Sequence, residues 1–309
     1  MLKKKITSFS SFFLIVLAAF LGGGAPPITK IGLKEIPPFS FVFFRFIFAV
    51  LILFPLFLKS KPKFNKDFFM VIVLSFLASI NVIFFPFGVK LTTANIAQTI
   101  YTAVPIFSAV ISFALLKERF NLIKVIGISI GFFGASFIIL LPLFSKDFNF
   151  WAGMTGNLII LIASISYSFY SVLSKKFQSN YSPLQLVFYF SLTTLFLMFL
   201  FSFSDLKNYP NWWQNLTIKG WFSIFFMGSI GTVAYFLLVQ ILIKKTTPVV
   251  ASTVLYLQPL ATFVWSYFLL KETLSFLLIA GFLLVLIGVW FTNNPNLNFL
   301  SKSSGKNQS

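Results

Sequence analysis

The chain has 309 residues, of which 58% are hydrophobic and only 10% are charged. A soluble domain carries about 25% charged residues, so this composition argues against a water-soluble globular protein. The 24 basic and 6 acidic residues give a net charge of +18, but the lysines stand in short groups between long apolar runs. This is the arrangement of membrane-protein loops, so we expect no nucleic-acid partner.

The absence of two residue types limits the catalytic and metal-binding chemistry that the chain can perform. The chain has no Cys and no His, which removes disulfides, thiolate nucleophiles and the commonest metal ligand and general base. It also has no P-loop sequence for nucleotide hydrolysis. An intramembrane enzyme would have only Ser, Thr and Tyr to work with. We therefore expect no cofactor, no metal site and no enzymatic activity.

Apolar segments long enough to cross a bilayer as helices occur ten times in the chain. They occupy approximately residues 9–29, 38–58, 68–88, 93–116, 122–143, 152–174, 183–203, 219–243, 247–270 and 274–292. The first could be a secretory signal, but a matching segment begins the second half, which favours an uncleaved span. The expected fold class is an all-α integral membrane protein with ten transmembrane helices.

The basic residues indicate the orientation of these spans. With a cytoplasmic N-terminus, the inside segments hold 16 Lys and Arg residues and the outside segments hold 7. Such an excess predicts that both termini are cytoplasmic. Residues 1–8 are then a cytoplasmic N-terminus and residues 293–309 a cytoplasmic tail. We expect a multi-pass protein of the cell (inner or plasma) membrane.

The two halves of the chain repeat one another. At an offset of 154, 13 of the 43 residues from 92 to 134 recur identically, including Pro105 as Pro259 and the Leu-Leu-Lys-Glu run 115–118 as 269–272. Earlier segments match at an offset of 145, such as Pro38 with Pro183. Each half holds five expected spans, and because five is odd, the second half enters the membrane in the opposite sense. Two inverted repeats around a central cavity are typical of secondary transporters.

These residues resemble the EamA-type transporters of the drug/metabolite transporter superfamily, over about residues 9–140 and 151–291. The resemblance rests on Gly22-Gly23, on Phe44-Arg45-Phe46, and on the duplicated pattern Ala97…Pro105…Lys117-Glu118-Arg119…Gly127…Gly134 and Ala251…Pro259…Lys271-Glu272…Gly281…Gly288. The chain departs from the family at Pro26-Pro27 and, in the second half, at Thr273. The resemblance implies two five-helix repeats, here 9–143 and 151–292, with alternating access. It also implies carriage of small metabolites, often amino acids and often outward.

Uncharged polar residues near the middle of the spans are the candidate lining of a substrate cavity. They are Asn81, Gln98, Tyr101, Tyr167, Tyr170, Tyr235, Tyr256 and Gln258, together with Pro105 and Pro259, whose rings leave carbonyls unpaired at mid-membrane. Amides and hydroxyls amid apolar walls suit an amphipathic metabolite, such as an amino acid with an apolar side chain. The alternative is a structural role, with hydrogen bonds between helices and packing kinks at the prolines.

Arg45 is the only ionisable residue well inside an expected span, roughly 10 Å deep at 1.5 Å per residue. Its guanidinium could contact an anion, because it binds a carboxylate bidentately. Alternatively it reaches outward, or pairs with Glu35 or backbone carbonyls. The alternative is favoured because the second span need not line the cavity.

A run of small residues and prolines interrupts the first span near its outer end. Gly22, Gly23, Gly24, Pro26 and Pro27 are therefore candidates for a helix break or gate, and close helix packing is the alternative. Glu118 and Glu272 precede the fifth and tenth spans. We expect each carboxylate to stabilise the N-terminus of the helix that follows it, with a gate or proton-carrier role as the alternative.

All six acidic residues lie at membrane edges or in loops. Proton-coupled carriers usually place acids inside the membrane, so we expect facilitated diffusion or exchange, with export as the direction. The alternatives are an importer of a nucleoside-like or cofactor metabolite, and a channel or receptor on the same fold. The expected partners are a small-molecule substrate and the lipid bilayer. The oligomeric state is left open, and a monomer is compatible with the sequence.

Overall fold

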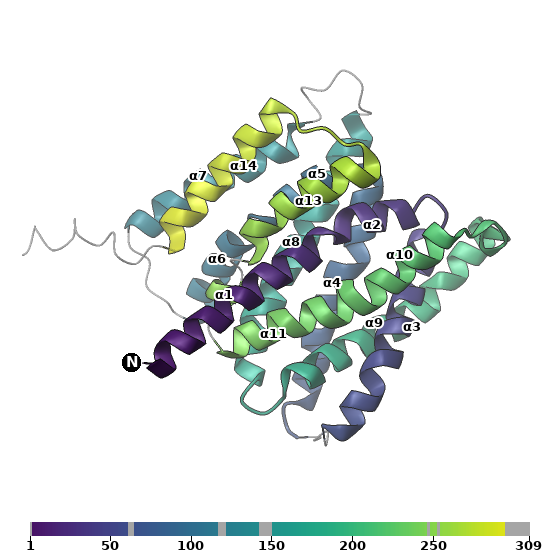
Figure 1. The fold of residues 1–309 in the computed structure, drawn as a ribbon, viewed down its shortest axis with the longest axis horizontal. Helices are drawn as coiled ribbons and strands as arrows, with labels where there is room; N and C mark the ends of the chain where they lie inside the picture. Colours follow the sequence, from purple (N-terminus) through teal and green to yellow (C-terminus); the bar gives the residue numbers. More distant parts are fainter. Residues whose placement is uncertain are drawn as a thin grey trace, which may run out of the picture.

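The computed structural model describes residues 2–60, 65–116, 122–141, 150–245, 248–251 and 254–293. Within these ranges the chain is helical and contains no strand (Figure 1). Seven helical segments are long and apolar enough to cross a membrane, and three shorter apolar helices run over Val125–Ile139, Val254–Leu270 and Phe276–Gly288. The expectation of an all-α protein with membrane-spanning helices is confirmed in these ranges.

The first part of the chain begins with two helices in one line. α1 (Leu2–Gly23) is followed directly by α2 (Ala25–Gly32), and the interruption falls at Gly24. The prolines of α2 occupy its first turn, where no backbone N–H is needed. α3 (Pro38–Lys59) and α4 (Phe68–Leu91) are long and uninterrupted.

The expected span 93–116 corresponds to one apolar segment, Ala94–Leu115, which is divided into two helices. It consists of α5 (Ala94–Tyr101) and α6 (Val104–Leu116), separated by a turn at Thr102 and Ala103. Because a new helix begins at Val104, Pro105 lies in the first turn of α6. A backbone N–H has no acceptor within the helix at that position, so the missing N–H of proline loses no hydrogen bond. The Ser168 hydroxyl, which donates to the Ser164 carbonyl of its own helix at 2.9 Å, lies 3.3 Å from the Val104 carbonyl beside the break.

The remaining helices follow the predicted order. They are α7 (Leu122–Ile139), α8 (Phe150–Phe177), α9 (Pro183–Asn208), the 3₁₀ turn η2 (Trp212–Asn215), α10 (Ile218–Gly228), the π-helical turn η3 (Ser229–Ala234), α11 (Tyr235–Lys245), α12 (Pro248–Ala251), α13 (Val254–Leu270) and α14 (Phe276–Asn293). The segments α10, η3 and α11 form one apolar run, with the π-helical turn in its middle. Such turns are rare and occur frequently at functional sites.

Helices of the first half pack mainly against helices of the second half. α3 packs along α9 and α7 along α14, while α4 contacts α8 and α9, and α1 contacts α13 and α11 (Figure 1). Gly23 permits the close approach of α1 to α13, because a Cβ there would lie 2.5 Å from the Ala261 Cβ. This contact supports the close-packing role for Gly23.

The outer surface of the described helices carries large apolar side chains. Phe69 and Phe133 are 73% and 70% exposed, and Phe196 and Phe268 are also largely exposed. A soluble monomer rarely exposes so many large apolar groups together. The bilayer accounts for this surface, because apolar side chains that contact lipid tails are not exposed to water.

Candidate functional site

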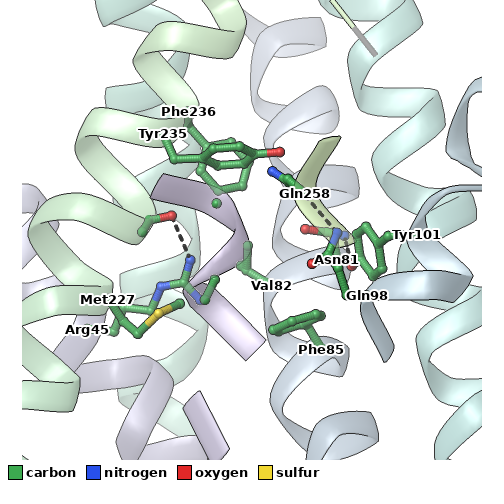
Figure 2. A pocket seen from close by; sticks show the side chains of 13 residues that line it. Arg45, Asn81, Val82, Phe85, Gln98, Tyr101, Met227, Tyr235, Phe236 and Gln258 are labelled. Atoms are coloured by element: carbon green, nitrogen blue, oxygen red, sulfur yellow. Dashed lines mark hydrogen bonds between the residues drawn. The ribbon is translucent and has the colours of Figure 1, made fainter. Parts of the chain in front are cut away.

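A cavity of about 60 Å³ lies between the two halves of the chain (Figure 2). Its lining comes from α1, α2, α3, α4, α5, α10, η3, α11 and α13: Gly22, Ala25, Arg45, Asn81, Val82, Phe85, Gln98, Tyr101, Met227, Gly231, Tyr235, Phe236 and Gln258. At roughly 10–15 Å³ for each water centre, it holds only a few waters. A metabolite therefore requires the cavity to widen.

The wall of the cavity is apolar with a few inward polar groups. Val82, Phe85, Met227 and Phe236 supply the apolar surface, and five uncharged polar side chains interrupt it. All five are buried, at 3–9% exposure: Asn81, Gln98, Tyr101, Tyr235 and Gln258. Apolar walls with sparse, placed polar groups are typical of sites for small amphipathic molecules.

Hydrogen bonds fix the orientation of Asn81. Its amide nitrogen donates to the Tyr101 hydroxyl at 2.5 Å and to the Ala163 carbonyl at 2.9 Å. Because both amide protons are used, the carbonyl oxygen of Asn81 remains as an acceptor at the cavity wall. The Tyr101 ring is placed by edge contact with Phe85, at 5.5 Å between centroids.

Gln98 and Gln258 join the two halves across the cavity. The Gln98 amide nitrogen donates to the Gln258 amide oxygen at 2.8 Å, linking α5 to α13 (Figure 2). Gln258 also lies beside Tyr235 in this view. A molecule passing between the halves must break or bypass this amide pair.

Arg45 is the charged group of the cavity and is only 3% exposed. Its Nε donates to the Thr232 hydroxyl at 2.7 Å and its Nη2 to the Gly231 carbonyl at 3.4 Å. No carboxylate pairs with it in the part of the chain that the structure describes. Glu35, the suggested partner, instead accepts from the Thr217 backbone and hydroxyl at 2.9 and 2.7 Å.

The structure brings seven of the predicted site residues to this cavity: Gly22, Arg45, Asn81, Gln98, Tyr101, Tyr235 and Gln258. The others are not among the residues that line it: Gly23, Gly24, Pro26, Pro27, Pro105, Tyr167, Tyr170, Tyr256 and Pro259. Tyr167 lies behind the wall, with its ring 6.5 Å from that of Tyr101. Pro105 and Pro259 are thus not among the residues that line this cavity.

Sequence reasoning missed the contribution of the π-helical turn. Gly231 lines the cavity and Thr232 binds Arg45, but neither was a candidate. The signal available was the group Gly228, Ser229, Gly231 and Thr232, four small or polar residues inside an otherwise apolar span. Such a run permits close helix approach and offers a hydroxyl to a buried cation.

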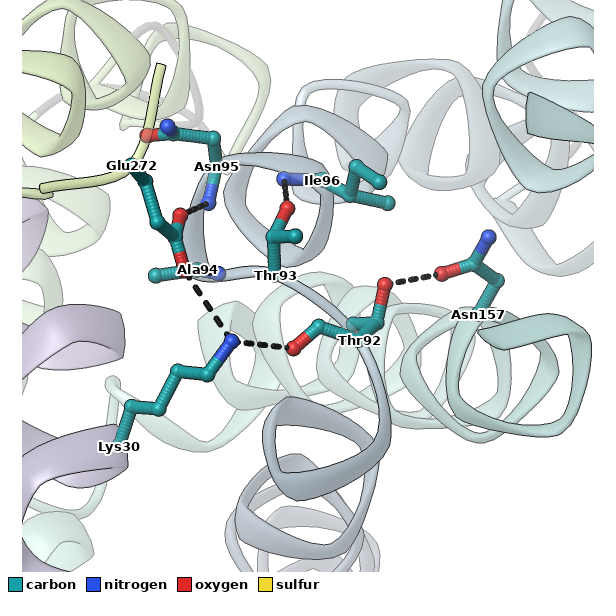
Figure 3. Close-up of polar contacts among 8 residues, drawn as sticks. All are labelled: Lys30, Thr92, Thr93, Ala94, Asn95, Ile96, Asn157 and Glu272. Atoms are coloured by element: carbon teal, nitrogen blue, oxygen red, sulfur yellow. Dashed lines mark hydrogen bonds and ion pairs between the residues drawn. The ribbon is translucent and has the colours of Figure 1, made fainter. Parts of the chain in front are cut away.

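A second polar cluster joins the halves near the C-terminal end of α2 (Figure 3). The Lys30 ammonium donates to the Thr92 carbonyl at 2.8 Å and lies 3.1 Å from the Glu272 carboxylate. The same carboxylate accepts from the first backbone amides of α5, those of Ala94 at 3.0 Å and Asn95 at 3.2 Å. Glu272 therefore caps α5.

The expected role of Glu272 at the start of the tenth span is wrong. α14 begins at Phe276, and its N-terminal amide of Leu278 donates to the Ser275 hydroxyl at 3.1 Å. Lys271 adopts φ = 58°, which reverses the chain after α13 and separates Glu272 from the next helix. Glu118, the equivalent residue of the first half, lies outside the described residues.

Comparison with known proteins follows the same two halves. The family model of the EamA-like transporter family matches residues 9–140 and 154–294. The chain is 26% identical to the uncharacterized transporter YdfC of Bacillus subtilis, over 93% of both chains. It is 23% identical to the S-adenosylmethionine uptake transporter of Rickettsia bellii, over 76% of both. A crystal structure at 18% identity has a TM-score of 0.65 and covers 92% of this chain and 96% of its own, which shows similarity of fold.

Proposed function

Because this chain belongs to the EamA-like transporter family, we propose that it is a secondary transporter of small metabolites that works by alternating access in the cell membrane. The cavity between its halves is the observation that carries this proposal. It is small, buried and lined from both halves, so movement of one half against the other would widen it toward one side at a time.

The proposed architecture is ten spans in two inverted repeats, residues 9–143 and 151–292. The pairing of helices supports it: α3 and α9 are second spans of their repeats, and α7 and α14 are fifth spans. A two-fold axis in the membrane plane would place equivalent spans together in this way. The charge excess of 16 to 7 supports cytoplasmic termini within the same proposal.

The proposed substrate class is amino acids with apolar side chains and related compounds. Arg45 offers a buried guanidinium that lacks a carboxylate partner within the described residues, and a substrate carboxylate would supply one. The apolar wall of Val82, Phe85 and Phe236 suits the side chain. A buried unpaired cation costs free energy, so binding of an anionic group is favoured.

Facilitated diffusion or exchange, with export as the direction, is the proposed mode. The acidic side chains of the described residues are engaged near helix ends. Glu35 and Glu272 hold the contacts given above, and Asp205 accepts from the Ser40 backbone at 2.7 Å near the start of α3. This arrangement leaves no described carboxylate at the cavity to carry a proton.

An importer of a nucleoside-like metabolite is the second candidate. One relative is named an S-adenosylmethionine uptake transporter and matches three quarters of this chain. S-adenosylmethionine carries an amino-acid group, so the Arg45 subsite would serve both substrate classes. The two candidates therefore differ in the volume that the widened cavity must provide.

Counterflow in proteoliposomes tests the proposal. Vesicles loaded with unlabelled L-leucine or S-adenosylmethionine are diluted into the same labelled compound without a pH gradient. We expect saturable counterflow of L-leucine. Counterflow of S-adenosylmethionine alone would favour the importer. Uptake strictly dependent on an imposed pH gradient would contradict exchange, and flux without saturation would indicate a channel.

A further inference from the structure

The π-helical turn η3 packs against α3 beside Arg45. Gly228, at the end of α10, permits this approach, because a Cβ there would lie 2.7 Å from the Arg45 carbonyl oxygen. The turn then presents the Thr232 hydroxyl and the Gly231 carbonyl to the guanidinium. Close backbone contact therefore brings the two hydrogen-bond acceptors within reach of the Arg45 side chain.

Two hydrogen bonds fix the orientation of the Thr232 hydroxyl. Its hydroxyl donates to the Met227 carbonyl at 2.8 Å, a residue five positions earlier, as π-helical geometry allows. A hydroxyl has a single proton, so the oxygen can only accept from Arg45 Nε, which it does at 2.7 Å. The side chain is 0% exposed, and water does not compete for this bond.

The guanidinium is thereby held along one edge. Nε and one Nη2 proton bond to η3, and the guanidinium carbon lies 5.3 Å from the centroid of the Phe46 ring. The remaining N–H groups of the fork have no hydrogen-bond acceptor among the described residues. Arg45 also lines the cavity. A fork fixed on one side presents its free N–H groups in a set direction, which is the geometry of bidentate carboxylate recognition.

We propose that Thr232 is a positioning residue, which holds Arg45 so that the cavity selects substrates that bear a carboxylate. This inference rests on the proposed function and assigns its anion subsite. Thr232 does not itself line the cavity and acts through Arg45. Loss of the Thr232 oxygen lets the Arg45 guanidinium change its orientation, while its charge remains. The selectivity for carboxylates therefore falls, although the protein still folds and its halves still move against each other.

Chemical labelling of Arg45 tests the inference without any need for transport. The chain has two arginines, so Arg119→Lys leaves Arg45 as the only one. Purified protein is labelled with phenylglyoxal, and modification is followed by peptide mass spectrometry. The probes are 4-methylpentanoate, L-leucine and 3-methylbutylamine, which share one side chain and differ in their charged groups. We expect both carboxylates to slow the labelling, and the amine to leave it unchanged.

Variants at position 232 then separate positioning from a merely structural role. In Thr232→Val, the concentration of carboxylate that halves the labelling rises roughly tenfold or more, the effect of losing one hydrogen bond to a charged group. Thr232→Ser keeps the oxygen and retains the protection. Thr194→Val is the matched control, since Thr194 is a buried hydroxyl bonded to Ser79 at 2.7 Å, away from the cavity lining. Thr232→Ala replaces the valine variant if that one does not fold.

Equal protection of Arg45 in the wild type and in Thr232→Val or Thr232→Ala would overturn the inference, as would protection by the amine alone. Leucine counterflow without carboxylate protection leaves the proposed transport in place and removes the anion subsite. Protection by 4-methylpentanoate without exchange of any amino acid keeps the subsite and removes the amino-acid substrate. The two failures are thus distinguishable.

Discussion

The Lys30 ammonium and the Glu272 carboxylate lie 3.1 Å apart and connect α2 to the turn after α13 (Figure 3). This is the one ion pair between side chains in the part of the chain that the structure describes. The Glu272 carboxylate also caps α5, and Thr92 bonds to Asn157 of α8 at 2.7 Å. Both halves of the chain therefore meet in this cluster, near the C-terminal end of α2.

Removal of the Glu272 carboxylate should destabilise the protein. Glu272→Ala leaves two α5 amides without their acceptor and removes the ion pair with Lys30, whose ammonium keeps only the Thr92 carbonyl, and this should cost about 1–3 kcal/mol. Glu272→Gln keeps an acceptor oxygen and should cost less. Thermal unfolding in detergent measures both changes. Lys34→Ala, an exposed lysine near the same cluster, is the control that should leave the unfolding temperature unchanged.

A reversible cross-link across the cluster should stop transport. The chain has no Cys, so Lys30→Cys with Glu272→Cys introduces the only thiols. A short bismethanethiosulfonate reagent joins them and prevents the halves from separating at this end. Counterflow should fall to the level of empty vesicles and return on reduction. Undiminished counterflow in the fully cross-linked protein would show that this end does not open.

Replacement of Arg45 by Lys should weaken binding while the charge is kept. A lysine ammonium lacks the planar fork and cannot reproduce the contacts to Thr232 and Gly231 together. We expect the half-saturation concentration for counterflow to rise roughly tenfold or more, with a smaller change in maximal rate. An unchanged half-saturation concentration would mean that the fork does not contact the substrate.

Two neighbouring glycines should respond differently to the same substitution. A Cβ on Gly23 would meet the Ala261 Cβ at 2.5 Å and the Gln258 carbonyl at 2.9 Å, whereas a Cβ on Gly24 has its nearest neighbours at 3.6 Å. Overpacking costs about 1–3 kcal/mol, so Gly23→Ala should lower the unfolding temperature and Gly24→Ala should not. Equal stability of the two variants would contradict the close contact of α1 and α13.

The apolar pattern predicts an all-helical membrane protein, which the described residues confirm, because span length and composition are local properties. The interruption at Gly24 was also readable, as were the polar groups Asn81, Gln98 and Gln258 that meet at the cavity. The break at Thr102 was missed, although Pro105 marked it, because a mid-span proline is also compatible with a kinked continuous helix, as Pro259 in α13 shows.

Contacts across the halves could not be derived from the sequence. The partner of Glu272 lies 178 residues away at Ala94, and the partner of Arg45 lies 187 residues away at Thr232. These pairs depend on how the helices pack, which local periodicity does not encode. A π-helical turn is likewise set by tertiary contacts rather than by the preference of its residues.

We expect the cavity between the halves to carry the substrate. Counterflow of L-leucine by the variants Asn81→Ala, Gln98→Ala and Gln258→Ala, each at wild-type expression, tests it most directly. We expect saturable counterflow in the wild type and a changed half-saturation concentration in these variants, since each removes a polar group that lines the cavity. Wild-type counterflow with unchanged kinetics in all three variants would contradict it.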